Sequence, residues 1–192
     1  MRKYIIVLVI LLLIIKLYEL REPEKIFQFN HELVNLLQTG DLVLIAGDSY
    51  KSEFVKVTDT YSNNYSHIGF IVKENDCITN IVHMSIDSGY IEWENLEDYV
   101  NKSKLLNIDF YRLNNKISSD EICKILEELN LKKIEFDYSF NHKEADKLYC
   151  SELIMTVLDM LGYKLQLNKQ KQYIYPSEFT KESISYKICL TN

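Results

Sequence analysis

The segment Leu148-Tyr-Cys-Ser-Glu-Leu-Ile-Met-Thr-Val-Leu-Asp-Met-Leu-Gly162 has a strongly helical pattern that begins at a cysteine. Its apolar residues recur at the three- and four-residue spacing of an α-helix, and Gly162 is a residue type that commonly follows a helix end. The pattern predicts a helix from about Cys150 to Leu161. One face of this helix must pack against the rest of the domain, with the cysteine in its first turn.

Cys150 is the candidate nucleophile of this segment. The first turn of a helix has unpaired backbone N–H groups and the positive end of the helix dipole, and both favour a thiolate over a thiol. Such surroundings can lower the pKa of a cysteine from roughly 8.5 to between about 3.5 and 7.5, and the same N–H groups can hold an oxyanion. An isolated cysteine is also often a buried, unreactive residue, so position alone leaves both interpretations open.

Composition indicates one globular domain that follows a distinct N-terminal segment. The chain has 192 residues, of which 47% are hydrophobic, enough for one sizeable core. A net charge of -6 argues against a nucleic-acid partner, because the basic residues form no stripe. No C-x-x-C pair suggests zinc, and four scattered cysteines are too few for a disulfide framework: Cys77, Cys123, Cys150 and Cys189.

The N-terminus contains an unbroken apolar run from Tyr4 to Ile15, between Arg2-Lys3 and Lys16. The run has no Ala, Gly, Ser or Cys, so it offers neither a small-residue cleavage site nor a lipid-bearing cysteine. We therefore expect an uncleaved single-pass membrane anchor in which residues 4–18 contact lipid. The basic residues before the run favour a catalytic domain on the extracytoplasmic side. The expected division is an anchor (1–19), a linker (20–30) and a folded domain (31–192).

Two segments, Tyr65 to Val72 and Cys77 to Met84, read as strands joined by a short polar connection. The tight connection predicts an antiparallel hairpin. His67 enters the first strand and His83 leaves the second, so both lie toward the same end of the hairpin. The two imidazoles are therefore expected to be neighbours across the sheet.

The remaining pattern predicts a mixture of short helices and strands, and thus an α+β fold in which an antiparallel sheet packs against the Cys150 helix. Ser118 and Glu121 form a capping box that starts a helix ending near Asn130. The other expected helices are His31 to Gln38, Ser52 to Val57, Glu94 to Val100 and a turn at Pro176, and the other expected strands are Leu42 to Ala46, Ile108 to Leu113 and Ser185 to Leu190.

From Gly40 to Phe179 the chain resembles the circularly permuted, NlpC-type branch of papain-like cysteine hydrolases, the YiiX/YebB-like group. In this branch the histidine precedes the cysteine, as it does here. The matching motifs are Gly40-Asp41-Leu-Val-Leu, Tyr65-Ser66-His67-Ile-Gly69, Phe136-Asp137-Tyr138-Ser-Phe140 and Leu148-Tyr149-Cys150-Ser151-Glu152-Leu153.

The resemblance implies a catalytic role for three residues. Cys150 is the implied nucleophile and His67 the implied base. Many relatives carry a glutamate late in the second strand, where this sequence has His83; we expect His83 to orient His67 instead. The candidate substrate-binding residues are Asp137, Tyr138 and Tyr149.

We therefore expect a membrane-anchored thiol hydrolase that cleaves an amide or ester bond, such as a cell-wall-type peptide or a lipid acyl group, through an acyl-enzyme on Cys150. No metal or organic cofactor is implied. Two alternatives stay open. One is a catalytically silent, membrane-tethered module that binds peptides or amino acids; the other is a lipid acyltransferase with the same Cys-His pair.

Overall fold

The computed structural model describes residues 30–47, 65–74, 78–103, 105–140, 146–165 and 173–190. The expected anchor, nearly all of the linker and the expected helix at Ser52 to Val57 lie outside these residues. Within the described part of the chain, no helix has the length and apolar character needed to span a membrane.

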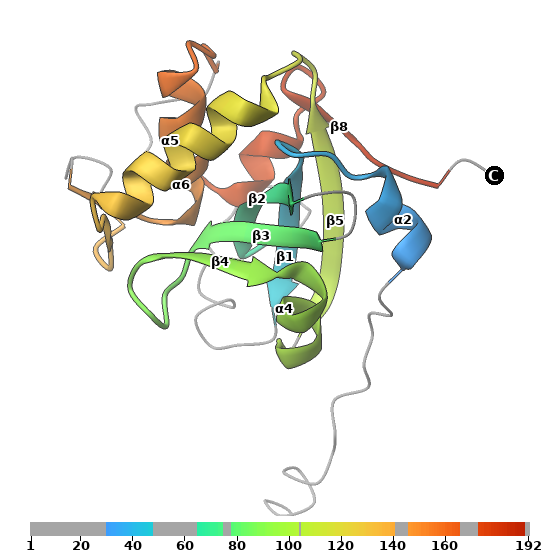
Figure 1. Ribbon diagram of the computed structural model, residues 1–192, viewed down its shortest axis with the longest axis horizontal. Coiled ribbons are helices and arrows are strands. Elements are labelled where there is room, and N and C mark those ends of the chain that lie inside the picture. The colour runs from blue at the N-terminus through green and yellow to red at the C-terminus, as the bar shows by residue number, and fades with distance from the viewer. Residues whose placement is uncertain are drawn as a thin grey trace, which may run out of the picture.

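The core of the fold is a six-stranded antiparallel sheet with the strand order β4-β3-β2-β1-β5-β8 (Figure 1). Consecutive strands pair as hairpins from β1 to β4, and β5 returns to the free side of β1. The strands are β1 (Leu42–Gly47), β2 (His67–Glu74), β3 (Ile78–Met84), β4 (Ile91–Asn95), β5 (Leu105–Leu113) and β8 (Ser185–Lys187). A separate parallel pair consists of β6 (Glu135–Phe136) and β7 (Lys147–Leu148).

Helices cover both faces of the sheet, which is why the central strand β1 is apolar at nearly every position. Leu42 and Leu44 face the larger core cluster, together with α5 (Ser119–Leu131) and α6 (Cys150–Met160). Val43 and Ile45 face a second cluster beneath α2 (His31–Leu36) and α4 (Leu96–Lys102). Figure 1 shows α5 and α6 side by side, away from α4. The expected α+β class and the sheet packed against the Cys150 helix are confirmed.

The Gly40-Asp41 motif has a structural explanation at the start of β1. Gly40 has a φ of +97°, a backbone conformation that glycine adopts without strain. The buried Asp41 carboxylate accepts the Gln38 backbone N–H at 2.7 Å and receives two hydrogen bonds of 2.8 Å from the Arg112 guanidinium. This bidentate ion pair joins the turn before β1 to the neighbouring strand β5.

Most of the expected elements form close to their predicted positions. The helix at Cys150, the helix capped by Ser118 and the His67/His83 hairpin are all present. The expected helix at Glu94 to Val100 is wrong at its start, because Ile91–Asn95 is an edge strand and the helix begins at Leu96. Asn95 caps this helix through its side-chain oxygen, which accepts N–H groups of the first turn. Glu94 therefore belongs to the sheet, where its carboxylate can reach the hairpin.

Candidate active site

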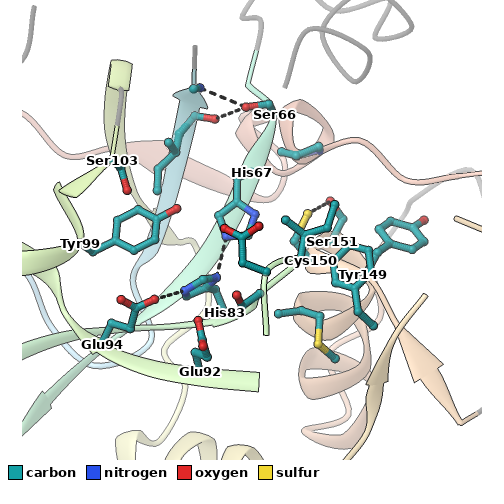
Figure 2. A pocket seen from close by; sticks show the side chains of 18 of the residues that line it. Ser66, His67, His83, Glu92, Glu94, Tyr99, Ser103, Tyr149, Cys150 and Ser151 are labelled. Carbon is teal, nitrogen blue, oxygen red and sulfur yellow. Dashed lines mark hydrogen bonds and ion pairs between the residues drawn. The ribbon is translucent and has the colours of Figure 1, made fainter. Parts of the chain in front are cut away.

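Cys150 is the first residue of α6 and lies on the wall of a cavity of about 810 Å³ (Figure 2). The short strand β7 and Tyr149 deliver the chain to this point, and the helix then follows the apolar pattern seen in the sequence. The thiol is largely buried, with 8% of the residue exposed. The sequence prediction of a cysteine in the first turn of a helix is therefore confirmed.

Hydrogen-bond donors surround the sulfur of Cys150. The backbone N–H groups of Ile68, Cys150 and Ser151 donate toward it, and the Ser151 hydroxyl lies 4.0 Å away. Two of these N–H groups belong to the first turn of α6, where no helical partner is available for them. The third comes from β2, the strand that begins at His67. This arrangement can stabilise negative charge on the sulfur or on an oxygen bound beside it.

The rings of His67 and His83 meet edge to face at the end of the β2/β3 hairpin. His67 Nε2 lies 2.9 Å from His83 Nδ1, and the two ring planes are perpendicular. Figure 2 shows the His67 ring between His83 and Cys150. The predicted contact between the imidazoles is confirmed. Among the described residues Cys150 has no hydrogen bond to His67, which is common for catalytic pairs in the absence of substrate.

Gly69 makes room for this histidine pair. A Cβ atom on Gly69 would lie 3.1 Å from the Cβ atom of His83 and 3.0 Å from the Val82 carbonyl oxygen. Both approaches are shorter than ordinary van der Waals contact, and the carbonyl is part of the backbone and cannot move aside easily. The glycine two residues after His67 is thus required by the close packing of the hairpin.

Two further residues, Glu94 and Lys102, continue this chain of contacts and were not among the residues predicted from the sequence. His83 Nε2 lies 3.1 Å from Glu94 Oε1, and the second oxygen of Glu94 is paired with the Lys102 ammonium. The strand assignment of Ile91–Asn95 was the signal that could have found Glu94, since its Ile-Glu-Trp-Glu alternation has the period of a half-buried strand. In that strand the Glu94 side chain lies on the same sheet face as His83.

Burial determines the charge states of Cys150 and His67. It raises the pKa of the Cys150 thiol, although the surrounding N–H donors oppose this effect. Burial also holds the pKa of His67 well below the ordinary histidine value of about 6.5. The expected lowering of the Cys150 pKa is therefore wrong in direction, because desolvation outweighs the helix N-terminus. The resting pair is a neutral thiol beside a neutral imidazole.

The cavity wall next to Cys150 is rich in aromatic rings. Tyr149 lines the cavity, as expected of a substrate-binding residue, and its hydroxyl accepts the backbone N–H of Ile174 at 2.8 Å. This bond ties the N-terminus of α6 to residues 173–176, which also line the cavity. The other aromatic residues of the wall are Tyr99, Phe136, Phe140, Tyr173 and Tyr175.

Asp137 and Tyr138, the other two candidate substrate-binding residues, do not line this cavity. Asp137 is 1% exposed, and its carboxylate accepts the backbone N–H and the hydroxyl of Ser139, which stabilises a turn. Tyr138 is 62% exposed and donates its hydroxyl to the Ile86 carbonyl. Their position in the motif before Cys150 is therefore explained by the local turn and its packing.

Glu152 lies in the first turn of α6 and closes the N-terminus of this helix. Its carboxylate accepts the Tyr149 backbone N–H at 3.2 Å, which is one half of a capping box. Burial raises the pKa of Glu152 to about 7. Its role is thus structural, since it caps the helix that carries Cys150.

One group of side chains among the described residues has the composition of a metal-ligand set. The ligand atoms of His83, Glu92 and Glu94 lie within 4.8 Å of one another. Two of the three residues are already engaged, because His83 bonds to Glu94 and Glu94 is paired with Lys102. A cation at this position would have to displace both the Nε2 proton of His83 and the ammonium of Lys102.

Comparison with known proteins places the chain in a family. Residues 36–186 match the model of a family described as permuted papain-like amidase enzymes, YaeF/YiiX, C92 family. No curated protein matches the chain significantly. A similar solved structure is the crystal structure of the metalloprotein yiiX from Escherichia coli O157:H7, with a TM-score of 0.55 and 20% sequence identity. The aligned region covers 65% of this chain and 66% of that chain, just under two thirds of its length. This likeness supports the fold.

We predict that the rate at which iodoacetamide alkylates Cys150 rises continuously as the pH increases from about 6 to about 9.5. The reason is the raised thiol pKa, which keeps the thiolate fraction growing throughout this range. Peptide mapping after short reactions measures the rate, with the exposed Cys189 as an internal reference at each pH. A plateau that begins below about pH 7 would contradict the neutral pair, since it would mean a preformed thiolate–imidazolium pair.

Proposed function

We propose that this chain, which belongs to the YaeF/YiiX (C92) family of permuted papain-like amidases, is a cysteine hydrolase. In the proposed reaction Cys150 attacks an amide or ester carbonyl. The observation that carries the proposal is the meeting of Cys150, His67 and His83 at one cavity, with backbone N–H groups directed at the sulfur. This combination contains a nucleophile, a base, an orienting group and donors for an oxyanion.

In the proposed first step, His67 accepts the thiol proton as the sulfur attacks the substrate carbonyl carbon. The base must be Nδ1 of His67, because Nε2 is bonded to His83. The carbonyl oxygen becomes an oxyanion that the N–H groups at the start of α6 stabilise. The proton on His67 then passes to the leaving nitrogen or oxygen as the tetrahedral intermediate collapses to an acyl-enzyme.

In the second step, His67 accepts a proton from water as that water attacks the thioester. Collapse of this intermediate releases a carboxylic acid and returns the proton to the Cys150 sulfur, so the resting neutral pair is restored. Because the pair starts uncharged, charge separation develops only during attack. The N–H donors that face the sulfur therefore act where the negative charge appears.

The substrate class that fits the cavity has an apolar or aromatic group beside the scissile bond. Rings of Phe140, Tyr149 and Tyr173 lie within 6.4 Å of one another by their centroids and form a continuous aromatic wall next to Cys150. Lipid acyl chains and cell-wall-type peptides with apolar side chains both meet this requirement. An acyltransferase would share the acyl-enzyme and differ only in the acceptor of the second step.

We also propose that residues 4–18 anchor the protein to a membrane as a single span, with the catalytic domain on the extracytoplasmic side. The support is the uninterrupted apolar run and the basic residues that precede it. This proposal is independent of the chemistry at Cys150.

Catalysis is tested with chromogenic acyl amides and acyl esters and a set of single variants. We predict that Cys150→Ala abolishes turnover and that His67→Ala lowers kcat/KM by about 10² to 10⁴, the usual contribution of a general base. Cys189→Ala is the matched control and should match wild type, because Cys189 is exposed and does not line the cavity. Assays with and without a chelator show whether a metal ion affects the rate.

Intact-mass measurement after acid quenching should detect the acyl-enzyme, as a mass increase on wild type that Cys150→Ala lacks. Added amines distinguish the two enzymatic alternatives, because an acyltransferase forms an amide product and a hydrolase forms free acid. Retained turnover in Cys150→Ala would contradict the proposed chemistry. Binding of peptides with no turnover and no acyl adduct would favour the silent binding module.

For the anchor, we predict that the full chain sediments with membranes after an alkaline wash and that Ile10→Lys shifts it to the soluble fraction. A lysine at the centre of a span raises the free energy of membrane insertion by about 2.5 to 3.5 kcal/mol. A run this short has little apolar surface to offset that increase. Ile10→Leu is the control and should behave as wild type. Recovery of the wild-type chain in the soluble fraction would contradict the anchor, and protease protection of intact cells or vesicles reports the side of the domain.

A further inference from the structure

We propose that Glu94 is a positioning residue that sets the tautomers of both histidines, so that the lone pair of His67 Nδ1 faces Cys150. This inference rests on the proposed function, since it assigns Glu94 a part in the Cys150–His67 reaction. It also extends the orienting chain beyond His83, with Lys102 as the group that keeps Glu94 in place. The atoms involved are drawn in Figure 2 for Glu94, His83 and His67.

The bond between Glu94 and His83 fixes the tautomer of His83. An ionised carboxylate can only accept hydrogen bonds, and Glu94 Oε1 lies 3.1 Å from His83 Nε2. His83 must therefore carry a proton on Nε2. A neutral imidazole has a single N–H group, so His83 Nδ1 is left as an acceptor.

The bond between the two imidazoles then fixes the tautomer of His67. The bond of 2.9 Å between His83 Nδ1 and His67 Nε2 needs one donor and one acceptor. Because His83 Nδ1 accepts, His67 Nε2 must donate. The proton of the neutral His67 ring is then fixed on Nε2, and Nδ1 holds a lone pair. This is the tautomer that a base for the Cys150 thiol needs.

Two partners, His83 and Lys102, keep the Glu94 carboxyl group ionised. The hydrogen bond from His83 and the ion pair with Lys102 hold the pKa of this carboxyl well below its usual range. Both partners of the ion pair are placed by the same local structure, since Glu94 is the penultimate residue of the edge strand and Lys102 is in the last turn of the helix that follows it. The Tyr99 ring of this helix contacts the His83 ring edge to face and lies under the Lys102 ammonium.

The presence of Lys102 makes Glu94→Gln a sharp test. An ammonium group can only donate, so the oxygen of a glutamine amide at this position should turn toward Lys102. Its NH₂ group would then point at His83 Nε2 and require an acceptor there. His83 would carry its proton on Nδ1 and donate to His67 Nε2, and His67 would be protonated on Nδ1. The base would face Cys150 with a proton instead of a lone pair.

The inverted tautomer should be measurable without any substrate. In ¹⁵N NMR of the full-length protein labelled at the histidine rings, wild type should show Nε2–H tautomers for His67 and His83, and Glu94→Gln should show Nδ1–H for both. The four histidines are assigned by single His→Asn variants: His31, His67, His83 and His142. A chelator is included, because a metal ion on His83 Nε2 would impose the Nδ1–H form. Glu97→Gln, exposed in the first turn of the helix that follows, is the control and should keep the wild-type tautomers.

Turnover gives the second readout. Glu94→Gln should lower kcat by at least about 10²-fold with little change in KM, as expected when a base is held in the wrong tautomer. In the double variant Glu94→Gln/Lys102→Met the amide is free to turn its oxygen to His83, so kcat should recover at least about 10-fold over Glu94→Gln. Glu97→Gln, exposed in the first turn of the same helix, should leave kcat unchanged.

The outcomes separate this inference from the proposed function. An Nδ1–H tautomer of His83 in wild type would overturn the role of Glu94, and this result does not require Glu94→Gln to fold. A kcat of the double variant no higher than that of Glu94→Gln would overturn it as well. Wild-type Nε2–H tautomers that invert in Glu94→Gln support the role of Glu94, even if no acyl substrate is turned over. In that case the proposed hydrolase activity fails and the positioning of His67 by Glu94 stands.

Discussion

The hydrogen bond between His67 and His83 is the contact on which the site depends. It joins two neighbouring strands at the end where they meet the first turn of α6, and it fixes the ring of His67 beside Cys150. The surrounding structure is arranged to permit it. Gly69 removes a Cβ that would collide with His83, and Tyr99 closes the other side of the His83 ring. A third residue that orients the base is common to Cys-His and Ser-His sites, and in the proposed site the imidazole of His83 fills that position.

An imidazole in the orienting position differs from a carboxylate in one physical respect: it has two possible tautomers. A carboxylate would enforce the tautomer of His67 directly, whereas His83 can either donate or accept through Nδ1. In the proposed arrangement Glu94 resolves this ambiguity from the edge strand, and its charge is balanced by Lys102. The negative charge therefore lies one ring farther from the nucleophile. This distance agrees with a resting state in which thiol and imidazole are both neutral, since Glu94 contacts His83 rather than His67 and burial favours the uncharged form of His67.

The sequence predicted the parts of the site that follow local patterns. The helix at Cys150 and the His67/His83 hairpin were visible because apolar periodicity and a short polar connection identify such elements. Glu94 was missed because the acidic residues of this short strand also suit the start of the helix that follows, and this second pattern was given more weight than the strand-like alternation. The direction of the Cys150 pKa was missed for another reason. A helix N-terminus can be read from sequence, but desolvation depends on tertiary packing.

The geometry of a trapped intermediate tests the central claim most directly. A small aldehyde that adds to Cys150 forms a hemithioacetal, whose oxygen mimics the oxyanion of acyl transfer. A crystal structure of this adduct should show that oxygen about 3 Å from a backbone N–H of the first turn of α6. His67 Nδ1 should lie on the Cys150 side, with Nε2 still bonded to His83 Nδ1. A His67 ring turned so that Nε2 faces the adduct, with the bond to His83 broken, would contradict the account.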